Sequence, residues 1–349
     1  MLRIAIVGAT GAVGRECLAL LDGGIVPVEK VVPVGSARSR GRDLRAELGL
    51  SLPVAEVVTL DELDPDGLDV AILSAGAEIS AREAERLAAA GVLVVDNSSA
   101  FRMRPDVPLV VPQVNPGLLD TRPGPNIVAN PNCSTIQLVR VLSPLHRLAG
   151  LEDVVVATYQ AASGGGVHGL RELTRQSETI LEDPKAQGAP GGRFGQPLAF
   201  NLVPEIGLQD DTGLTHEERK LVREPRKILG LPGLRLRATA VRVPVFDCHS
   251  EAVHIRLREP VTPAALEKAL AATDGLRVYP RSQSPSYPMP RTVFATAEDR
   301  ALVHVGRIRV EPEDDRAAAL WVVADNLWVG AALNALQIVE LATGNGWLG

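Results

Sequence analysis

Aromatic side chains are scarce in this chain of 349 residues, since Phe, Trp and Tyr together make up only 3% of it. Proteins that bind nucleic acids commonly stack bases on aromatic rings, so this scarcity argues against such a surface. The formal net charge of −6 also argues against a polyanionic partner. We therefore expect no nucleic-acid partner.

Cysteine is equally rare. The three cysteines, Cys17, Cys133 and Cys248, are odd in number and lack the spacing of metal ligands, which excludes a disulfide framework and a zinc site. No apolar run approaches the roughly 20 residues of a membrane span. The apolar N-terminus is interrupted at once by glycine and lacks the cleavage site of a signal peptide. These absences predict a reduced, cytoplasmic protein that has no metal and does not associate with membranes.

Apolar residues make up 46% of the chain, and its length suits about two domains. In the first third, short runs that are apolar on both faces alternate with helical patterns, which is typical of a doubly wound parallel (Rossmann) sheet. Helices are expected through Leu18–Leu21 and over Ala81–Ala90. Strands are expected over Leu2–Val7, Lys30–Val34, Val70–Leu73, Val92–Val95 and Leu109–Val111.

From about Asn130 the pattern changes to longer strands, which predicts an α+β domain with a mixed or antiparallel sheet and helices on one face. The expected strands are Val154–Tyr159, Leu234–Val245, Glu251–Leu257 and Val303–Val310. Helices are expected to Leu181, over Glu217–Leu229 and Pro263–Ala272, and in a final segment that ends at Gly344. The Gly/Pro-rich stretch Pro184–Pro204 is too long for a simple connection and suggests a functional or dimer-contacting loop.

The motif GATGAVG follows the first strand and opens the first helix. Glycine at Gly8, Gly11 and Gly14 allows a tight turn, close approach of a pyrophosphate and close packing of the helix on the strand. This context favours a dinucleotide over a simple tight turn, and the turn also contributes Thr10, Ala12 and Val13 as candidate contacts. Ser74, Ala75 and Gly76 end the third strand, where they could line the same ligand.

The cofactor type depends on the end of the second strand, where NAD binding calls for Asp or Glu. The sequence there is GSARSRGR, in which Ser36, Arg38 and Ser39 offer hydroxyls and a guanidinium but no carboxylate. Arginine suits a 2′-phosphate, so the loop predicts NADP. The alternative is a solvated basic loop with no ligand.

The motif NPNCST places Cys133 after an Asn-Pro-Asn turn and before a helical apolar pattern. A helix N-terminus favours an anion and lowers the pKa of a thiol, although a small buried hydrophobe is the alternative. With a nicotinamide cofactor, such a cysteine suggests aldehyde oxidation through a covalent thio-intermediate, which needs a base. His249, between two strand-like runs, is the most promising of six histidines. His168 stays open, and His146, His216, His254 and His304 suit structural or surface positions.

Several motifs occur together in one order: GATGAVG, SSAFRM (98–103), NPNCST (130–135), QAASGGG (160–166), EERK (217–220) and RVPVFDCHSE (242–251). With them the chain resembles aspartate-semialdehyde dehydrogenase from its first residue to its final helix. The resemblance implies Cys133 as nucleophile, His249 as the general acid/base, and Gln160 as a residue that orients substrate and nucleophile. It implies Arg242 for the substrate α-carboxylate and Glu217 for its ammonium group. The implied phosphate-binding set is Arg102, Asn132, Lys220 and Ser99.

The resemblance further implies NADPH-dependent reductive dephosphorylation of L-aspartyl-4-phosphate to L-aspartate 4-semialdehyde, in the biosynthesis of lysine (through diaminopimelate), methionine, threonine and isoleucine. It adds Ser163, Gly164 and Asn326 to the cofactor contacts and implies a homodimer. The expected domains are 1–129 for NADP, joined by the helix 326–349, and 130–325 for catalysis and dimerisation. Cys248 is expected to be inert.

Two alternatives remain open at this point. N-acetyl-glutamyl-phosphate reductase uses the same chemistry on a longer, acylated substrate, but its substrate has no free ammonium for Glu217 to bind. A non-catalytic Rossmann protein could bind NADPH alone, although Cys133 and His249 together argue against it.

Overall fold

The computed structural model describes residues 1–186 and 192–348, so part of the predicted loop Pro184–Pro204, residues 187–191, lies outside the described residues. The chain forms two compact units: Met1–Asn132 with Ala331–Gly349, and Cys133–Gly330. Among the described helices, none is both long enough and apolar enough to cross a membrane.

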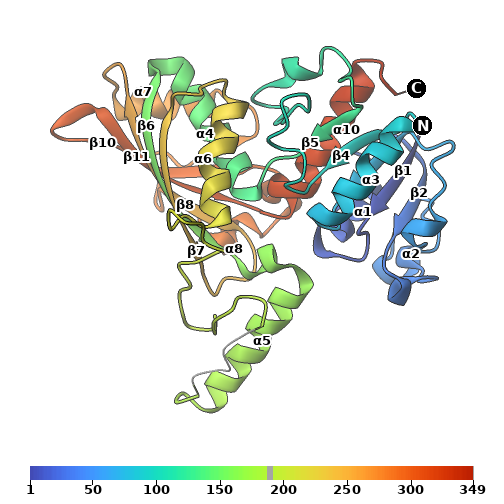
Figure 1. Cartoon of the computed structure of the whole chain (residues 1–349). Helices are drawn as coiled ribbons and strands as arrows, with labels where there is room; N and C mark the ends of the chain where they lie inside the picture. Colours follow the sequence, from blue (N-terminus) through green and yellow to red (C-terminus); the bar gives the residue numbers. More distant parts are fainter. Residues whose placement is uncertain (187–191, 349) are drawn as a thin grey trace. The chain divides into compact units, whose positions relative to one another are not determined.

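The first unit is built on a parallel sheet of five strands in the order β2-β1-β3-β4-β5, which confirms the predicted parallel sheet (Figure 1). The strands are β1 (Leu2–Val7), β2 (Val28–Val34), β3 (Val70–Leu73), β4 (Leu93–Asp96) and β5 (Ile127–Ala129). The helices are α1 (Ala12–Asp22), α2 (Leu44–Leu48), α3 (Ala77–Ala89) and α10 (Leu333–Gly344).

The order of the strands puts helices on both faces of this sheet. The connection through α1 runs from β1 to one side, and the connection through α3 runs from β3 to the other. Because both crossovers are right-handed, their helices cover opposite faces. Residues of α1 and α10 pack together in one buried cluster with Ile4, Ile6 and Ile72 of the sheet. The C-terminal helix therefore belongs to the core of the first unit.

The prediction of a strand over Leu109–Val111 is wrong. Leu109 forms only an isolated bridge, to Ala129, and the fifth strand of the sheet is β5 instead. The segment is nevertheless buried, with Leu109, Val110 and Val111 all at 0% exposure. Its apolar run reflects burial rather than strand pairing, and periodicity cannot separate the two in three residues.

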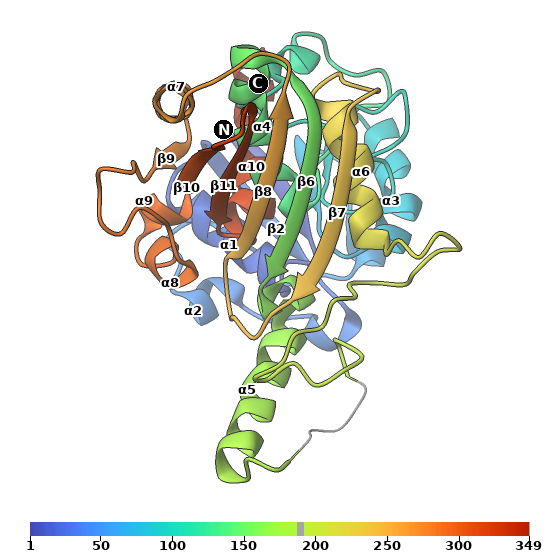
Figure 2. The same ribbon diagram turned by 90° about the vertical axis from the view of Figure 1, so that its left-hand side faces the viewer.

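The second unit contains a mixed sheet of six strands in the order β7-β6-β8-β11-β10-β9, as predicted for an α+β domain. The strands are β6 (Leu151–Gln160), β7 (Arg235–Arg242), β8 (His249–Leu257), β9 (Leu276–Val278), β10 (Val303–Glu311) and β11 (Asp314–Ala324). The pairs β6–β7 and β9–β10 are parallel and the other pairs are antiparallel. Figure 2 shows this sheet face-on.

Helices α4 and α6 pack against one face of the mixed sheet, behind the strands in Figure 2, and α7 lies beside β9 and β10. The helices of this unit are α4 (Cys133–Ala149), α5 (Gly166–Glu182), α6 (His216–Ile228), α7 (Pro263–Ala271), α8 (Pro290–Val293) and α9 (Ala297–Arg300). α5 extends away from the sheet in both views. The face opposite α4 carries partly exposed side chains such as Val155 and Trp321.

Strand β11 has no counterpart in the sequence prediction, although it pairs on both sides, with β8 and β10. It begins with Asp314 and Asp315, and its next residues are Arg316 and three alanines. Aspartate and alanine are depleted in strands, so local propensity hides this one. Its position is set by pairing with two neighbours rather than by its own composition.

Candidate active site

Cys133 is the first residue of α4, as the apolar pattern predicts. The helix is buried along most of its length, and its first turn carries Ser134 and Thr135, both at 0% exposure. At this position Cys133 lies at the N-terminal end of the helix, where the helix dipole is positive. The dipole favours the anionic thiolate, which is the form that reacts as a nucleophile.

Gln160, Arg242 and His249 lie at one edge of the mixed sheet. Gln160 ends β6 and Arg242 ends the parallel strand β7, where the two residues are register partners. β8 runs antiparallel to β6, so its first residue, His249, starts at the same edge. The topology therefore collects three predicted site residues that are far apart in the sequence.

His249 is completely buried, and its Nδ1 accepts a hydrogen bond of 3.1 Å from the backbone N–H of Ala161. Since that nitrogen must then offer its lone pair, the neutral ring carries its proton on Nε2. The pKa of His249 is lowered to about 3, mainly by burial and to a smaller extent by the charge of Arg242, whereas the charge of Glu217 opposes the shift. The ring is therefore neutral at physiological pH, with Nε2 as the nitrogen that can act.

Arg242 is 7% exposed and donates from Nη1 to the Ala161 carbonyl at 2.7 Å. Burial lowers the pKa of its guanidinium, while the charges of Glu217 and Cys133 raise it. Gly164 packs directly on this side chain, because a Cβ there would lie 2.6 Å from Nη1 and 3.3 Å from Cε1 of His249. The triple glycine thus lets the chain pass close to both Arg242 and His249.

Glu217 lies in the first turn of α6, which starts with a capping box between Thr215 and Glu218. Its Oε1 accepts from Gln160 Nε2 at 3.2 Å, and its Oε2 pairs with Lys220 Nζ at 2.9 Å, one turn along the helix. Glu217 is 7% exposed, whereas Lys220 is more open. The EERK motif therefore presents a buried carboxylate and a cation on one face of α6, beside the end of β6.

Asn326 lies after β11 and connects two parts of the same unit. Its Nδ2 donates to Ser163 Oγ at 3.0 Å, and its Oδ1 accepts from the backbone N–H of Cys248 at 3.0 Å. Cys248 is buried with Val293 and Val323, and burial raises the pKa of its thiol, as expected for an inert cysteine. Asn326 therefore links the QAASGGG loop to the residue before His249.

The first unit holds the glycine-rich turn between β1 and α1. Gly8 has φ +92°, and a Cβ on it would lie 2.6 Å from the Ser74 carbonyl oxygen. A Cβ on Gly14 would lie 2.4 Å from the Gly8 carbonyl oxygen. Only glycine allows this turn, which leaves backbone N–H groups at the start of α1, next to the Ser74–Gly76 segment. This geometry fits a dinucleotide pyrophosphate.

The basic loop follows β2 directly. Arg38 and Ser39 lie in the short 3-10 helix Ala37–Ser39, and Ser36 directly precedes it. Ser36 and Arg38 are exposed, whereas Ser39 is buried. The other arginines of this loop are engaged, Arg40 with Glu62 and Arg42 with Glu47. The end of β2 thus carries an exposed guanidinium where NAD binding would call for a carboxylate.

The remaining residues of the expected phosphate set also lie in the first unit, apart from Lys220. Arg102 is 6% exposed and donates to two backbone carbonyls, Asn130 at 2.9 Å and Asn97 at 2.8 Å. Asn132 is buried and Ser99 is exposed. Arg102 is therefore not a solvated surface charge. It is a buried cation that is hydrogen-bonded to Asn130, the first residue of the NPNCST motif.

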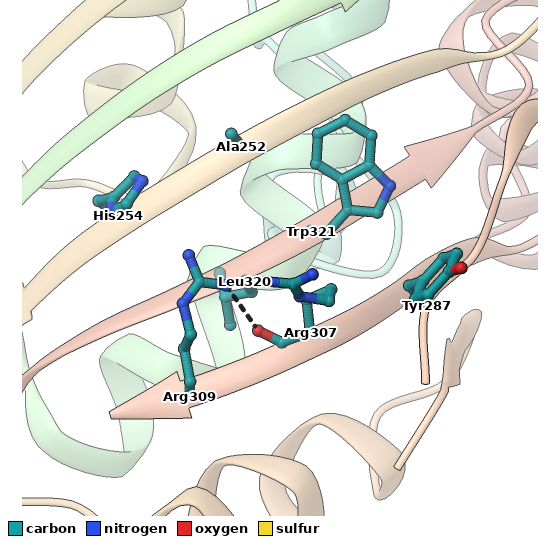
Figure 3. A pocket seen from close by; sticks show the side chains of 7 residues that line it. All are labelled: Ala252, His254, Tyr287, Arg307, Arg309, Leu320 and Trp321. Carbon is teal, nitrogen blue, oxygen red and sulfur yellow. Dashed lines mark hydrogen bonds between the residues drawn. The ribbon is translucent and has the colours of Figure 1, made fainter. Parts of the chain in front are cut away.

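A separate hollow lies on the face of the mixed sheet opposite α4 (Figure 3). It is lined by Ala252, His254, Tyr287, Arg307, Arg309, Leu320 and Trp321, and Arg309 Nη1 donates to the Arg307 carbonyl at 3.2 Å. None of the predicted site residues lines it. His254 takes part in this outer face, and His168 is exposed on α5, so neither belongs to the edge that holds His249.

Two residues that support this edge have no role in the sequence prediction. Ala161 binds His249 and Arg242 through its backbone alone, which leaves no side-chain signal. Gly330, in the π-helix Trp328–Ala332, lies against Cys133, because a Cβ there would be 2.7 Å from Cys133 Cβ. A glycine inside a helical pattern was the available clue, since such a glycine often marks a close contact.

Comparisons with known proteins agree with this architecture. The family model described as semialdehyde dehydrogenase, NAD binding domain, matches residues 3–121, and the one described as semialdehyde dehydrogenase, dimerisation domain, matches residues 142–329. The chain therefore has a domain for a nicotinamide cofactor and a dimerisation domain.

Several proteins that match this chain over nearly their full lengths carry the same name. Aspartate-semialdehyde dehydrogenase of Aquifex aeolicus is 41% identical over 99% of this chain and 98% of its own, and that of a Synechocystis strain is 42% identical over 99% of both. The crystal structure of aspartate semialdehyde dehydrogenase II complexed with ASA from Vibrio cholerae matches with a TM-score of 0.91 and 39% identity, over 99% of this chain and 98% of that one. The resemblance seen in the motifs is thereby confirmed, and the chain belongs to the aspartate-semialdehyde dehydrogenase family.

Proposed function

We propose that the protein catalyses the reversible, NADPH-dependent reductive dephosphorylation of L-aspartyl-4-phosphate to L-aspartate 4-semialdehyde, in amino-acid biosynthesis. The observation that carries the proposal is the sheet edge of the second unit, where Gln160, Arg242 and His249 lie together, with Glu217 hydrogen-bonded to Gln160. Cys133 opens the helix that packs on the same sheet.

Cys133 is the nucleophile in this proposal. Its thiolate attacks the acyl carbon, the C–O bond to phosphate breaks, and a thioester forms while phosphate leaves. The N–H groups of the first turn of α4 are donors for the negative oxygen of the tetrahedral centre. NADPH, when bound, supplies the hydride that reduces the thioester to a thiohemiacetal. That thiohemiacetal collapses to the aldehyde and regenerates the thiolate of Cys133.

His249 is assigned the acid/base work at the reacting oxygen. With Nδ1 held by the Ala161 N–H, the nitrogen that shares a proton with that oxygen is Nε2. The neutral ring can donate a hydrogen bond from Nε2 as the oxygen becomes negative, and this stabilises the thiohemiacetal anion. The same nitrogen serves the reverse reaction, as microscopic reversibility requires.

The two charged ends of aspartate match two charged side chains. Arg242 offers a planar guanidinium for the α-carboxylate, a bidentate task that suits arginine better than lysine. Glu217 offers a carboxylate for the α-ammonium group, and its bond to Gln160 orients both side chains. The family resemblance assigns the phosphate to Arg102, Asn132, Ser99 and Lys220.

The first unit is assigned to the cofactor, as its NAD-binding-domain match supports. Gly8, Gly11 and Gly14, with Thr10, Ala12 and Val13, form the pyrophosphate turn, and Ser74, Ala75 and Gly76 lie beside it. The preference for NADP rests on Ser36, Arg38 and Ser39. The family resemblance assigns Ser163, Gly164 and Asn326 to the nicotinamide end of the cofactor. We also propose a cytoplasmic location and a homodimer formed through the dimerisation domain.

The direct test is phosphate-dependent reduction of NADP with L-aspartate 4-semialdehyde. We expect turnover only when semialdehyde, NADP and phosphate are all present. N-acetyl-glutamate semialdehyde serves as the competing substrate, and we expect it to be used poorly because it lacks the ammonium group that Glu217 binds. A preference for the acetylated substrate, or no dependence on phosphate, would contradict the proposal.

The cofactor assignment has its own test. Arg38→Ala removes the exposed guanidinium at the end of β2, so we expect kcat/KM for NADP to fall by about tenfold or more, with little change for NAD. Steady-state kinetics with both cofactors measure the ratio. Arg45→Ala, on α2, is the control for loss of a positive charge nearby. An equal fall for both cofactors after Arg38→Ala would overturn the assignment to the 2′-phosphate.

A further inference from the structure

Arg300, which is not among the proposed catalytic residues, is held by an ion pair and by two aromatic rings. It ends α9, and its Nε donates to Oδ2 of Asp325 at 2.6 Å. Asp325 is fully buried, and the side chain of Arg300 is 16% exposed. The guanidinium carbon lies 4.5 Å from the centre of the Phe294 ring and 4.2 Å from that of Trp328. An ion pair and two aromatic contacts thus fix the orientation of this side chain.

Asp325, the partner of Arg300, organises the turn that follows β11. Its Oδ1 accepts the backbone N–H groups of Leu327 at 2.8 Å and Trp328 at 3.1 Å. Its carbonyl oxygen accepts from the N–H of Gly330 at 3.1 Å. The side chain and main chain of one residue therefore define the whole turn from Asp325 to Gly330.

The same turn contacts the surroundings of the proposed catalytic residues through Asn326 and Gly330. Asn326 binds Ser163 Oγ and the backbone N–H of Cys248, the neighbour of His249. Gly330 packs so closely on Cys133 that a Cβ would lie 2.7 Å from Cys133 Cβ and 3.1 Å from its Cα. A small displacement of the turn therefore moves the surface against which the nucleophile rests.

We propose that Arg300 is a positioning residue for catalysis, which holds the turn 325–330 against Cys133 through Asp325. In this proposal Arg300 acts on the reaction through the turn 325–330. Arginine suits the task because its flat cation can pair with a carboxylate and lie against two rings at once, which a lysine ammonium cannot do equally well. The proposal rests on the assignment of Cys133 as nucleophile.

The test is the double variant R300M/D325N. Methionine keeps apolar contact with the two rings, and asparagine keeps an oxygen for the N–H groups of Leu327 and Trp328, so no buried charge is left without a partner. We expect a folded protein in which kcat falls by about tenfold or more, because a misplaced reacting group costs rate even when binding is intact. We also expect slower alkylation of Cys133 by iodoacetamide, with the dissociation constant for NADPH unchanged. Cys17 and Cys248 are buried and should contribute little to this signal.

The matched control is R86M/E83Q on α3 of the first unit, which removes another arginine–carboxylate pair with a buried acid; Glu83 also pairs with the exposed side chain of Arg82. We expect it to leave kcat and the alkylation rate unchanged. R300K keeps the charge and loses the stacked plane, so we expect an intermediate kcat; this variant decides the question if the double variant does not fold.

The proposal fails if folded R300M/D325N, or R300K in its place, keeps both kcat and the alkylation rate within about twofold of the wild type. Failure of the proposed function looks different, because the wild-type protein would then lack phosphate-dependent turnover of the semialdehyde. The alkylation rate of Cys133 would still report in that case whether Arg300 positions the thiol.

Discussion

At the scale of single residues, the side chains assigned to chemistry are held largely by backbone groups. The N–H and C=O of Ala161 bind His249 and Arg242 respectively, and α4 begins at Cys133 itself. Backbone partners cannot change rotamer, so they hold a ring or a guanidinium more firmly than another flexible side chain would. Each of the three side chains can therefore be tested separately, with the geometry around it expected to survive.

Cys133→Ala removes the proposed nucleophile without adding bulk. We expect NADPH to bind normally and turnover to fall by more than about a thousandfold, because the covalent route is lost. Fluorescence titration measures the binding, and the phosphate-dependent assay measures the turnover. Cys17→Ala is the matched control, since Cys17 is a buried thiol in α1 whose pKa is raised by burial to about 12 and which should be inert. Substantial turnover by Cys133→Ala would refute the mechanism.

Two substitutions of His249 distinguish the roles of its two ring nitrogens. The side-chain oxygen of asparagine can replace Nδ1 as the acceptor of the Ala161 N–H, but asparagine is too short to reach the position of Nε2. Glutamine is longer and can place an amide N–H near the position of Nε2. If Nε2 does the work, we expect His249→Asn to stay folded and lose about 10²–10⁴-fold in kcat, with His249→Gln less impaired. Thermal melting and kcat for both variants give the comparison. The reverse order of activities would assign the work to Nδ1.

At the scale of elements, the edge that holds the proposed catalytic residues depends on where strands and helices end. Gln160, Arg242 and His249 are terminal residues of β6, β7 and β8, and Glu217 is in the first turn of α6. The turn after β11 adds Gly330, whose missing side chain makes room for Cys133. Close contact at this glycine means that an added methyl group must displace Cys133.

Gly330→Ala tests this contact. A Cβ 2.7 Å from Cys133 Cβ cannot be accommodated without movement, so we expect a loss of about 1–3 kcal/mol in the free energy of unfolding and a fall in kcat of about a hundredfold. Gly344→Ala is the matched control, because a Cβ on that helical glycine would meet nothing within 4 Å. There we expect unchanged kcat and equal or higher stability. Denaturant unfolding and kinetics on both variants measure the difference.

These elements also show what the sequence could predict. The parallel sheet is readable because its strands are apolar on both faces, and the start of α4 is readable from the turn Asn-Pro-Asn followed by a helical pattern. β11 is hidden because the first half of its sequence, DDRAAA, has poor strand propensity, and because the strand depends on two partner strands. The support given by Ala161 is hidden because it comes from the backbone. The assignment of Glu217 and Lys220 to substrate binding came from the family resemblance. Charge spacing alone cannot distinguish these two residues from charged residues on a solvated helix face.

At the scale of the whole molecule, two buried groups oppose each other in the dependence of stability on pH. His249 is neutral and completely buried in the folded protein, and its pKa is lowered from 6.5 to about 3, mainly by burial. Glu251, two residues along β8, is also completely buried, and burial raises its pKa well above 4.5, against a smaller effect of the Gln137 side chain. The histidine resists protonation and the glutamic acid resists ionisation.

The signs follow from which state binds more protons. Between about pH 3 and 6.5 the unfolded chain binds a proton at His249 that the folded protein does not, so this group's contribution to stability is complete above 6.5 and is lost as the pH falls. Above pH 4.5 the unfolded chain releases the Glu251 proton that the folded protein keeps, so this contribution is complete below 4.5 and is lost as the pH rises. The two groups together favour a stability maximum at mildly acidic pH.

Glu251→Gln replaces the neutral acid by a neutral amide of the same shape and removes the alkaline loss. We expect the variant to gain in free energy of unfolding relative to the wild type as the pH rises from 5 to 8, by up to about 1.4 kcal/mol for each pH unit. His249→Asn should show the opposite trend and gain relative to the wild type as the pH falls from 6.5 to 4. Urea unfolding at each pH measures both differences, and Glu178→Gln on the exposed surface of α5 is the control with a flat difference. A Glu251→Gln difference that is constant from pH 5 to 8 would mean that Glu251 already ionises in the folded protein, with a charged partner supplied as the chain folds or assembles.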